Sequence, residues 1–389
     1  MPALPHFIGW AHTRFGKLDN PDVESLMAEV AISAIEDAGL EAGDIDAISV
    51  GVFGAGFSRQ SFDAALVGAA EPMLARIPAT RSENACATGS AALYSALDQI
   101  EAGRARRVLV IGAEKMTASS GADVNDILLG CAHRRTEDGA GSFAGIFAGI
   151  AREYADRYGN PREALALIAA KNHRNGVRNP YAHLRKDLGF EFCATESERN
   201  PVVADPLLRT DCSMVSDGAA ALVVSADQPV SGRAGVAVRA RAQANEPMAL
   251  AARHDPIAFD GARRAFREAL RVAEISLSDL DLVETHDCFT VAELLQYEAF
   301  GLAEKGKGAE VLAEGRTQRD GDLPFNVSGG LKSKGHPIGA TGVSQHVLAA
   351  MQLTGEAGDM QLSTADRAAV FNMGGAAVAN YATVLEALQ

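Results

Sequence analysis

The chain has 389 residues and a formal net charge of −14; hydrophobic residues make up 47% of it and charged residues 22%. The apolar content excludes disorder as the dominant state, and at roughly 150 residues per domain the length predicts two to three domain-sized units. The acidic balance disfavours a nucleic-acid-binding protein, because a negative surface repels the phosphate backbone.

Signals for a membrane or for secretion are also missing. The longest apolar stretches, such as residues 143–151, fall well short of the roughly 20 residues that cross a bilayer. The N-terminal segment has no basic region followed by an apolar one, so we expect a cytoplasmic protein without membrane insertion. The five cysteines include no C-x-x-C pair, which argues against a disulfide framework or a zinc site and for a reducing compartment.

A helix–turn–strand pattern occurs twice along the chain. Residues 31–48 and 266–283 share a helical apolar spacing, followed by a turn and a pair of aspartates. Similar strand openings start at Gly218 and Gly375, but these two lie closer together in the sequence. The repeated patterns predict two similar α/β halves, residues 1–230 and 231–389, and the shorter spacing of the second pair predicts a long polar insertion at about 116–209 in the first half. Alternating helices and strands predict mainly parallel pairing, with helices on both faces of the sheet.

Cys86 lies between an extended segment at 77–81 and a helix whose apolar residues recur from Leu93 to Ile100. The turn therefore places a thiol at the start of a helix, among small residues. The free amides and the positive dipole end of a helix favour a thiolate and lower its pKa. A lone cysteine is usually a small buried hydrophobic residue, but this turn favours a nucleophile.

His286 and Cys288 follow a predicted strand at 281–284 and precede a predicted helix at 291–300. They would lie at the carboxyl end of a strand, where parallel sheets place their sites, and their side chains suit proton transfer. A metal pair is the alternative interpretation. No second His/Cys cluster completes four ligands, so we expect no metal.

His336 lies in a glycine-rich loop at 326–342 that leads into a helix predicted from near Thr341. Pro337 fixes the backbone after the histidine and so orients its ring. By itself such a histidine is more often a turn residue than a base. The presence of His286 and Cys288 elsewhere in the chain is what makes His336 a candidate base.

A predicted strand at 370–373 ends in a glycine turn. The Gly374 amide there is either half of an oxyanion hole or part of an ordinary tight turn.

These segments resemble, in family order, four motifs of the thiolase family, and within it of the sterol-carrier-protein-type thiolases. Asn84–Cys86 is similar to the nucleophile turn, and Gly335–Pro337 to the loop of the activating histidine. His286–Phe289 resembles the block that marks this subgroup. Asn372–Gly375 matches the fourth block with one departure.

The departure is Asn372, which stands where most thiolases have their acid/base cysteine. In the subgroup, the cysteine that corresponds to Cys288 takes over that role. The resemblance further implies that Cys86 attacks the thioester carbonyl, that His336 takes its proton, and that the amides of Cys86 and Gly374 hold the oxyanion. His286 and His336 would hold the enolate.

The resemblance implies a five-layered αβαβα fold of two similar halves, an inserted loop domain that holds coenzyme A, and a homodimer or tetramer. It implies an acetyl-CoA acyltransferase that makes or cleaves a 3-ketoacyl-CoA in fatty acid or sterol degradation. Coenzyme A would be a co-substrate, and no cofactor would be bound permanently. The resemblance leaves open whether a small partner protein also binds. The insertion carries a basic stretch that would either bind the coenzyme A phosphates or form a solvated helix face. Its members are Lys171, Arg174, Arg178, Arg185 and Lys186, of which Arg174, Arg178 and Lys186 are the candidate ligands.

Two alternatives stay open. A decarboxylating ketoacyl synthase would use Cys86, His286 and His336 and would need no acid/base thiol such as Cys288. A non-thiolytic subunit, acting in a retro-aldol reaction or as the scaffold of a lipid-metabolising complex, would account for Asn372 but leaves the intact Cys86 without a use.

Overall fold

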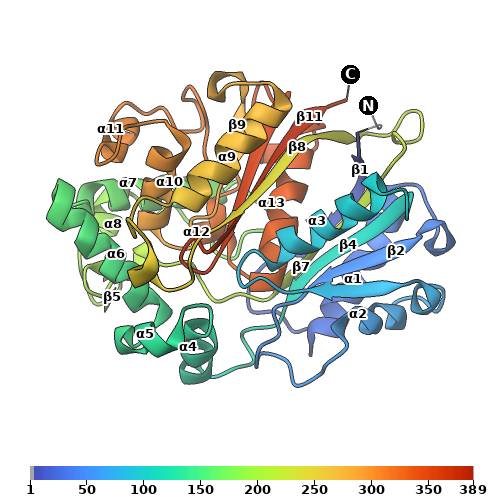
Figure 1. Ribbon diagram of the computed structural model, residues 1–389, viewed down its shortest axis with the longest axis horizontal. Helices are drawn as coiled ribbons and strands as arrows, with labels where there is room; N and C mark the ends of the chain where they lie inside the picture. Colours follow the sequence, from blue (N-terminus) through green and yellow to red (C-terminus); the bar gives the residue numbers. More distant parts are fainter. Residues whose placement is uncertain (1–3, 389) are drawn as a thin grey trace.

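The computed structural model describes residues 4–388; residues 1–3, part of the segment scanned for a secretion signal, and 389 lie outside that range. Its largest feature is a nine-stranded mixed sheet (Figure 1). The strands, in spatial order, are β3 (Ala79–Ser82), β2 (Ala47–Gly51), β4 (Arg107–Glu114), β7 (Gly218–Ser225), β1 (His6–His12), β8 (Val236–Asn245), β11 (Ala379–Ala387), β10 (Arg367–Gly374) and β9 (Leu282–Glu284).

The order of the strands reflects two similar halves. One half runs β1, α1 (Val23–Asp37), β2, α3 (Thr88–Glu101), β4, β7, and the other runs β8, α9 (Asp260–Ala273), β9, α13 (Ile338–Leu353), β10, β11. The halves meet where β1 pairs with β8, so the order of strands on one side mirrors the order on the other. The repeated segments 31–48 and 266–283 fall on α1–β2 and α9–β9, which are equivalent places in the two halves.

The prediction of mainly parallel pairing is wrong. Only β2–β3, β2–β4 and β9–β10 are parallel, whereas the other five neighbouring pairs of the sheet are antiparallel. The last strand of each half causes the difference. β11, for example, follows β10 through a short turn at Gly375, and so short a connection forces an antiparallel pair.

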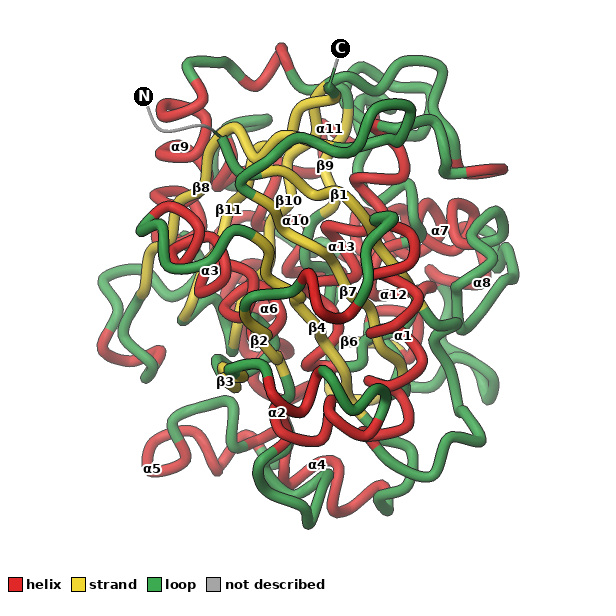
Figure 2. Tube along the Cα trace, turned by 90° about the vertical axis from the view of Figure 1, so that its right-hand side faces the viewer, coloured by secondary structure: helices red, strands yellow, loops and turns green. Residues whose placement is uncertain are grey.

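Helices and sheet alternate in five layers, as the resemblance implies. α3 and α13 contact each other in the centre, and α13 also contacts β4 and β7 of one half and β10 and β11 of the other (Figures 1 and 2). α1 covers the outer face of β1, β4 and β7, and α9 covers β8 and β11. The central helices approach closely because glycines face each other: a Cβ atom on Gly342 would lie 2.4 Å from the Ser90 amide nitrogen.

The insertion between β4 and β7 forms the teal-to-green part of Figure 1 and has mostly helical structure. Its elements are α4 (Gly121–Leu129), α5 (Arg134–Glu137), α6 (Phe143–Tyr158), α7 (Arg162–Gly176), α8 (Phe190–Ala194) and the short pair β5 (Val202–Ala204) and β6 (Leu207–Leu208). The remaining helices are α2 (Asp63–Leu66), α10 (Thr290–Phe300), α11 (Gly308–Ala313) and α12 (Gly330–Lys334).

A buried ion pair fastens this insertion to the second half. Lys171 on α7 lies 2.5 Å from Glu293 on α10, and neither side chain is exposed. The lysine also donates to the Phe325 carbonyl at 3.1 Å. Such a pair stabilises only when its hydrogen bonds are satisfied, and breaking it by removing one partner costs about 3–5 kcal/mol.

Within residues 4–388, no helix combines the length and apolar content that crossing a bilayer requires.

Candidate active site

Three loops from different parts of the chain bring the predicted site residues together. Cys86 precedes α3, His286 and Cys288 lie between β9 and α10, and His336 lies between α12 and α13. The Cys86 sulfur and one ring nitrogen each of His286 and His336 lie within 4.8 Å of one another. The carboxyl end of a strand positions the first two loops, which is where α/β sheets commonly place their sites.

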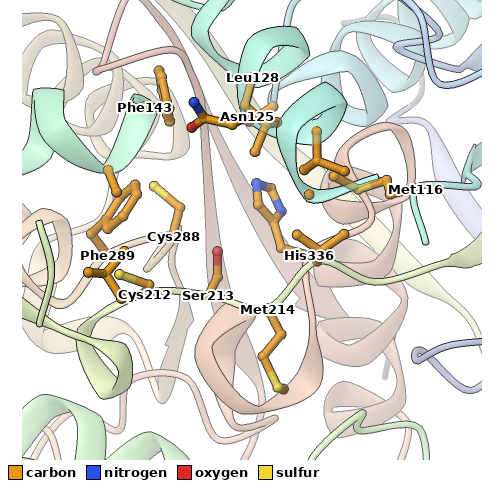
Figure 3. Close-up of a pocket in the computed structure, with 16 residues that line it drawn as sticks. Met116, Asn125, Leu128, Phe143, Cys212, Ser213, Met214, Cys288, Phe289 and His336 are labelled. Carbon is orange, nitrogen blue, oxygen red and sulfur yellow. The ribbon is translucent and has the colours of Figure 1, made fainter. Parts of the chain in front are cut away.

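A cavity of about 250 Å³ opens onto these groups, and Cys86, Cys288 and His336 all line it. Figure 3 shows Cys288 and His336 on opposite sides of this space. The rest of the lining is mainly apolar, and most of it comes from the insertion and the segment before β7: Met116, Val124, Leu128, Phe143, Val203, Met214 and Val215. An apolar cavity with a few convergent polar groups is typical of a small-molecule site.

The local backbone fixes the nucleophile turn. Ala85 has a φ angle of 49°, a left-handed conformation that costs energy for a residue with a Cβ atom and that clusters at functional sites. The Asn84 amide donates to the Thr88 hydroxyl at 2.8 Å, and the Asn84 side chain donates to the Tyr381 hydroxyl at 2.8 Å. The turn thus holds Cys86 just ahead of α3, as the sequence predicts.

The electrostatics of Cys86 favour the thiolate. A hydrogen bond with the Cys131 thiol is the largest cause that lowers the pKa of Cys86 well below its usual value; burial opposes it, and His336 and His286 lower the pKa further. The direction agrees with the sequence prediction, and neighbouring side chains contribute to it. Cys131 follows the end of α4 in the insertion, and no feature of its local sequence marks it.

The hydrogen-bond partners of His336 define which of its nitrogens can accept a proton. Its Nδ1 lies 2.7 Å from the Thr341 hydroxyl, which donates its own proton to the Pro337 carbonyl at 2.9 Å. The hydroxyl oxygen can therefore only accept from Nδ1–H, which leaves Nε2 with a lone pair. This Nε2 has no hydrogen-bond partner among residues 4–388, so its lone pair is available to accept a proton.

His286 is neutral at physiological pH. Its ring crosses that of His336 almost at a right angle, with 5.1 Å between the centroids. Burial lowers the pKa of His286 to about 4, and the neighbouring Cys86 opposes this shift. Its Nε2 also lacks a hydrogen-bond partner among the described residues.

Cys288 has the opposite electrostatic environment to Cys86. Burial raises the pKa of Cys288 well above its usual value, and the negative charges of Cys86 and Asp287 raise it further. Cys288 is therefore a neutral thiol, able to give up a proton only to a strong base such as a carbanion. The neighbouring Asp287 accepts from the amides of Leu331 at 2.6 Å and Lys332 at 3.2 Å, which fastens α12, the helix just before His336.

Gly374 lies at the end of β10 against the nucleophile turn. A Cβ atom there would stand 2.3 Å from the Asn84 carbonyl oxygen, so only glycine fits this close approach. The contact brings the fourth motif next to Cys86. The use of the Gly374 amide as an oxyanion donor stays a prediction.

The predicted coenzyme A ligands lie elsewhere. Arg174, Arg178 and Lys186 are exposed, and none of them lines the cavity; Arg174 pairs weakly with Asp187 at 3.8 Å. Lys171, which belongs to the same basic stretch, is fully buried against Glu293 and so cannot meet a phosphate in this structure. The prediction that Lys171 could meet a coenzyme A phosphate is wrong, because the ion pair with Glu293 buries this side of α7.

Comparisons with known proteins agree with the motifs. Residues 7–228 match the family model of the thiolase N-terminal domain, and residues 242–387 match the thiolase C-terminal domain-like model. An acetyl-CoA acetyltransferase of Methanothermobacter thermautotrophicus is 38% identical over 95% of both chains. Human sterol carrier protein 2 is 33% identical over 94% of this chain and 69% of its own length.

The fold is also found among solved structures. A structure described as an Ltp2-ChsH2(DUF35) aldolase has a TM-score of 0.82 at 21% identity and covers 99% of this chain and 98% of its own. At that identity the likeness concerns the fold alone. Taken together with the family models and the four motifs around the cavity, these matches show that the chain belongs to the thiolase family.

Proposed function

We propose that this thiolase-family acyltransferase makes or cleaves a 3-ketoacyl-CoA through an acyl group carried on Cys86. One observation supports the proposal most directly: a thiolate-stabilised Cys86 shares one apolar cavity with the free Nε2 of His336 and the neutral thiol of Cys288. Nucleophile, base and acid are then in place for both halves of the reaction.

In the first half, the Cys86 sulfur attacks the thioester carbonyl of the acyl donor, and His336 takes up the thiol proton. The amides of Cys86 and Gly374 would hold the oxygen anion; losing one such donor costs typically about 2.7–4 kcal/mol. The anion collapses, the carbon–sulfur bond to coenzyme A breaks, and its thiolate leaves with the proton from His336. The acyl group then resides on Cys86.

In the second half, Cys288 first gives its thiol proton to Nε2 of His336, and the resulting thiolate removes the α-proton of an acetyl-CoA. The enolate oxygen is held by the N–H groups of His286 and of the protonated His336. The α-carbon attacks the acyl carbonyl on Cys86, forming the carbon–carbon bond and releasing the Cys86 thiolate. Cleavage runs the same steps backwards, so the protonated Cys288 delivers its proton to the departing enolate carbon.

Selective alkylation tests whether the thiols of Cys86, Cys288 and Cys131 are ionised or neutral. Iodoacetamide is expected to modify Cys86 first, and its rate should level off at a lower pH than the rates of the other cysteines, because the pKa of this thiol is lowered well below its usual value. Cys288 and Cys131, whose pKa values are raised, should react far more slowly. Peptide mapping by mass spectrometry measures each rate, and the unfolded chain is the control because all cysteines titrate near pH 8.5 there. A Cys86 rate that levels off at the same pH as in the unfolded chain would contradict the proposal.

The substrate screen tests the reaction itself. The cavity of about 250 Å³ must also admit the end of the coenzyme A arm, so we propose a short acyl group. Acetoacetyl-CoA is expected to be cleaved fastest in the presence of coenzyme A, with rates falling as the chain lengthens. Leu128→Ala, which removes an apolar side chain from the lining, should raise the relative rate of longer substrates. Rates that increase with chain length in the unmodified enzyme would point to fatty acid or sterol side-chain degradation, a role that the sterol carrier protein 2 relatives support.

The same screen separates the alternatives. A decarboxylating synthase would condense malonyl-CoA and ignore acetyl-CoA, and the proximity of Cys288 to Cys86 disfavours it, because decarboxylation needs no acid/base thiol. A retro-aldol or scaffold subunit would cleave no 3-ketoacyl-CoA at all. The likeness in fold to an aldolase keeps that alternative in the test.

Assembly and ligands complete the proposal. We propose coenzyme A as a co-substrate, with Arg174, Arg178 and Lys186 near its phosphates, and a cytoplasmic location. A homodimer or tetramer is supported by the edge strand β3, whose residues are mostly exposed and which contacts α2, preceded by Phe62 with 83% of its surface exposed. The structure described as an Ltp2-ChsH2(DUF35) aldolase names two components, and this supports the proposal that a small partner protein binds here as well.

A further inference from the structure

Asn372 makes three hydrogen bonds that join the two halves of the molecule at the active site. It lies on β10 and is completely buried. Its Nδ2 lies 3.1 Å from the Cys86 carbonyl oxygen and 2.9 Å from His286 Nδ1, and its Oδ1 lies 2.8 Å from the Ser90 hydroxyl. A residue that replaces a catalytic cysteine thus contacts both the nucleophile turn and a histidine of the site.

The Cys86 carbonyl fixes which way the Asn372 amide faces. A carbonyl oxygen only accepts, so the atom of Asn372 that lies next to it must be the NH₂ group. The amide oxygen then faces Ser90, whose hydroxyl donates to it. The alternative orientation would set two acceptor oxygens against each other and leave both unpaired in a buried site, which costs about 1–3 kcal/mol for each group.

This orientation determines the proton on His286. The second N–H of the same NH₂ group points at His286 Nδ1, so Nδ1 must supply a lone pair. A neutral imidazole carries a single proton, which is therefore on Nε2, a buried nitrogen without a hydrogen-bond partner among the described residues. His336 holds its proton on Nδ1, as its bond to Thr341 requires. The two histidines are thus opposite tautomers.

We infer that Asn372 is a positioning residue that holds His286 in its Nε2–H tautomer, so that His286 donates a hydrogen bond to the enolate oxygen and only His336, of the two histidines, serves as a base. The inference rests on the proposed function for the enolate, whereas the tautomers follow from the hydrogen bonds alone. The principle is established for serine proteases, where an asparagine facing Nδ1 forces the proton onto Nε2 and that histidine no longer acts as a base. A protonated Nε2 is also unable to ligate a metal, which argues against a metal on the Cys86–His286–His336 cluster.

The tautomers can be measured directly. Long-range nitrogen–proton NMR spectra of the enzyme with isotope-labelled histidine are expected to show His286 protonated on Nε2 and His336 on Nδ1, with each signal assigned by its loss in His286→Gln or His336→Gln. Finding His286 protonated on Nδ1, or both rings in the same tautomer, would overturn the inference. This experiment needs no activity, so it stands even if the enzyme cleaves no 3-ketoacyl-CoA.

Asn372→Asp tests the consequence for catalysis. An aspartate of the same shape can only accept, so His286 must protonate Nδ1 to face it, and Nε2 keeps a proton only while the ring is cationic. The titratable groups around His286 are Cys86, His336 and Lys334. The unmodified His286, with a pKa of about 4, donates at every pH above about 5. In the variant the donor is lost as the pH rises through the raised pKa of the ring.

The expected result is therefore a change in pH profile. Proton exchange at the α-carbon of acetyl-CoA in Asn372→Asp should fall as the pH rises and be roughly 10²–10³-fold below the unmodified enzyme at high pH, the loss typical of one oxyanion donor. Acyl exchange between acetyl-CoA and labelled coenzyme A should fall much less. Asn380→Asp is the matched control, because Asn380 is a buried asparagine that donates to the Ala244 and Ala377 carbonyls and contacts neither histidine.

Two results would count against the inference. Equal losses of the two exchange rates at every pH would mean that Asn372 has only a structural role. The same pH profile in Asn380→Asp would attribute the effect to a buried carboxylate anywhere in this half. If the unmodified enzyme itself exchanges neither group, the proposed function fails, and the NMR measurement still decides the tautomers.

Discussion

Cys86→Ala is expected to abolish formation of the acyl-enzyme and to lower the rate of 3-ketoacyl-CoA cleavage by more than about 10⁴-fold, because the remaining groups have no nucleophile to activate. The thiolate-stabilised sulfur of Cys86 is in contact with His286, His336 and Cys131, and Cys288, which shares its cavity, is held as a neutral thiol. No neighbouring thiol can therefore substitute for it. Mass spectrometry of the intact protein after mixing with acetyl-CoA measures the adduct.

The control is Cys193→Ala. Cys193 is buried in the insertion, in a separate apolar cluster with Ala166 and Ala169, and it does not line the cavity. This variant should form the adduct normally. An acetyl adduct of undiminished yield in Cys86→Ala would remove Cys86 from the mechanism.

Cys288→Ala should separate the two halves of the reaction. Acyl exchange with labelled coenzyme A needs only Cys86 and its base, so it should stay within about tenfold of the unmodified rate. Exchange of the acetyl methyl protons with deuterated water should fall by roughly 10²–10⁴-fold, the range for loss of a positioned acid or base. The raised pKa of Cys288 is consistent with a proton carrier for so weak an acid as a thioester α-carbon.

Deuterium incorporation followed by NMR, beside acyl exchange on the same preparation, makes this comparison. If proton exchange persists at the unmodified rate, Cys288 has no acid/base role, and Cys131 becomes the next thiol to test. Cys193→Ala again serves as the control for the loss of a buried thiol.

Much of the site could be predicted from local sequence because each motif carries its own backbone signals. A strand before Cys86 and an apolar helix after it are enough to place the thiol at a helix start, and the structure has β3 and α3 there. The helix after His336 begins at Ile338, three residues before the predicted start. The signal for the earlier start was present, since a proline is favoured at the beginning of a helix.

Other features had no local signal. Cys131 reaches Cys86 only because the insertion folds back over the nucleophile turn. Lys171 looked like a surface cation because its partner, Glu293, is far away in the sequence. The mostly antiparallel sheet depends on which strands lie next to each other, and the alternation of helices and strands does not contain that information.

The sequence by itself determined the thiolase family and the two repeated halves, and it predicted the four side chains of the site, because motifs and hydrophobic periodicity are written in neighbouring residues. Only the tertiary structure decided the chemistry of those side chains. The ionisation of Cys86, the neutrality of Cys288 and the opposite tautomers of the histidines depend on partner atoms from Cys131, Thr341 and Asn372. A proton is held by whichever atoms lie within about 3 Å of it, and folding brings those atoms together from distant parts of the chain.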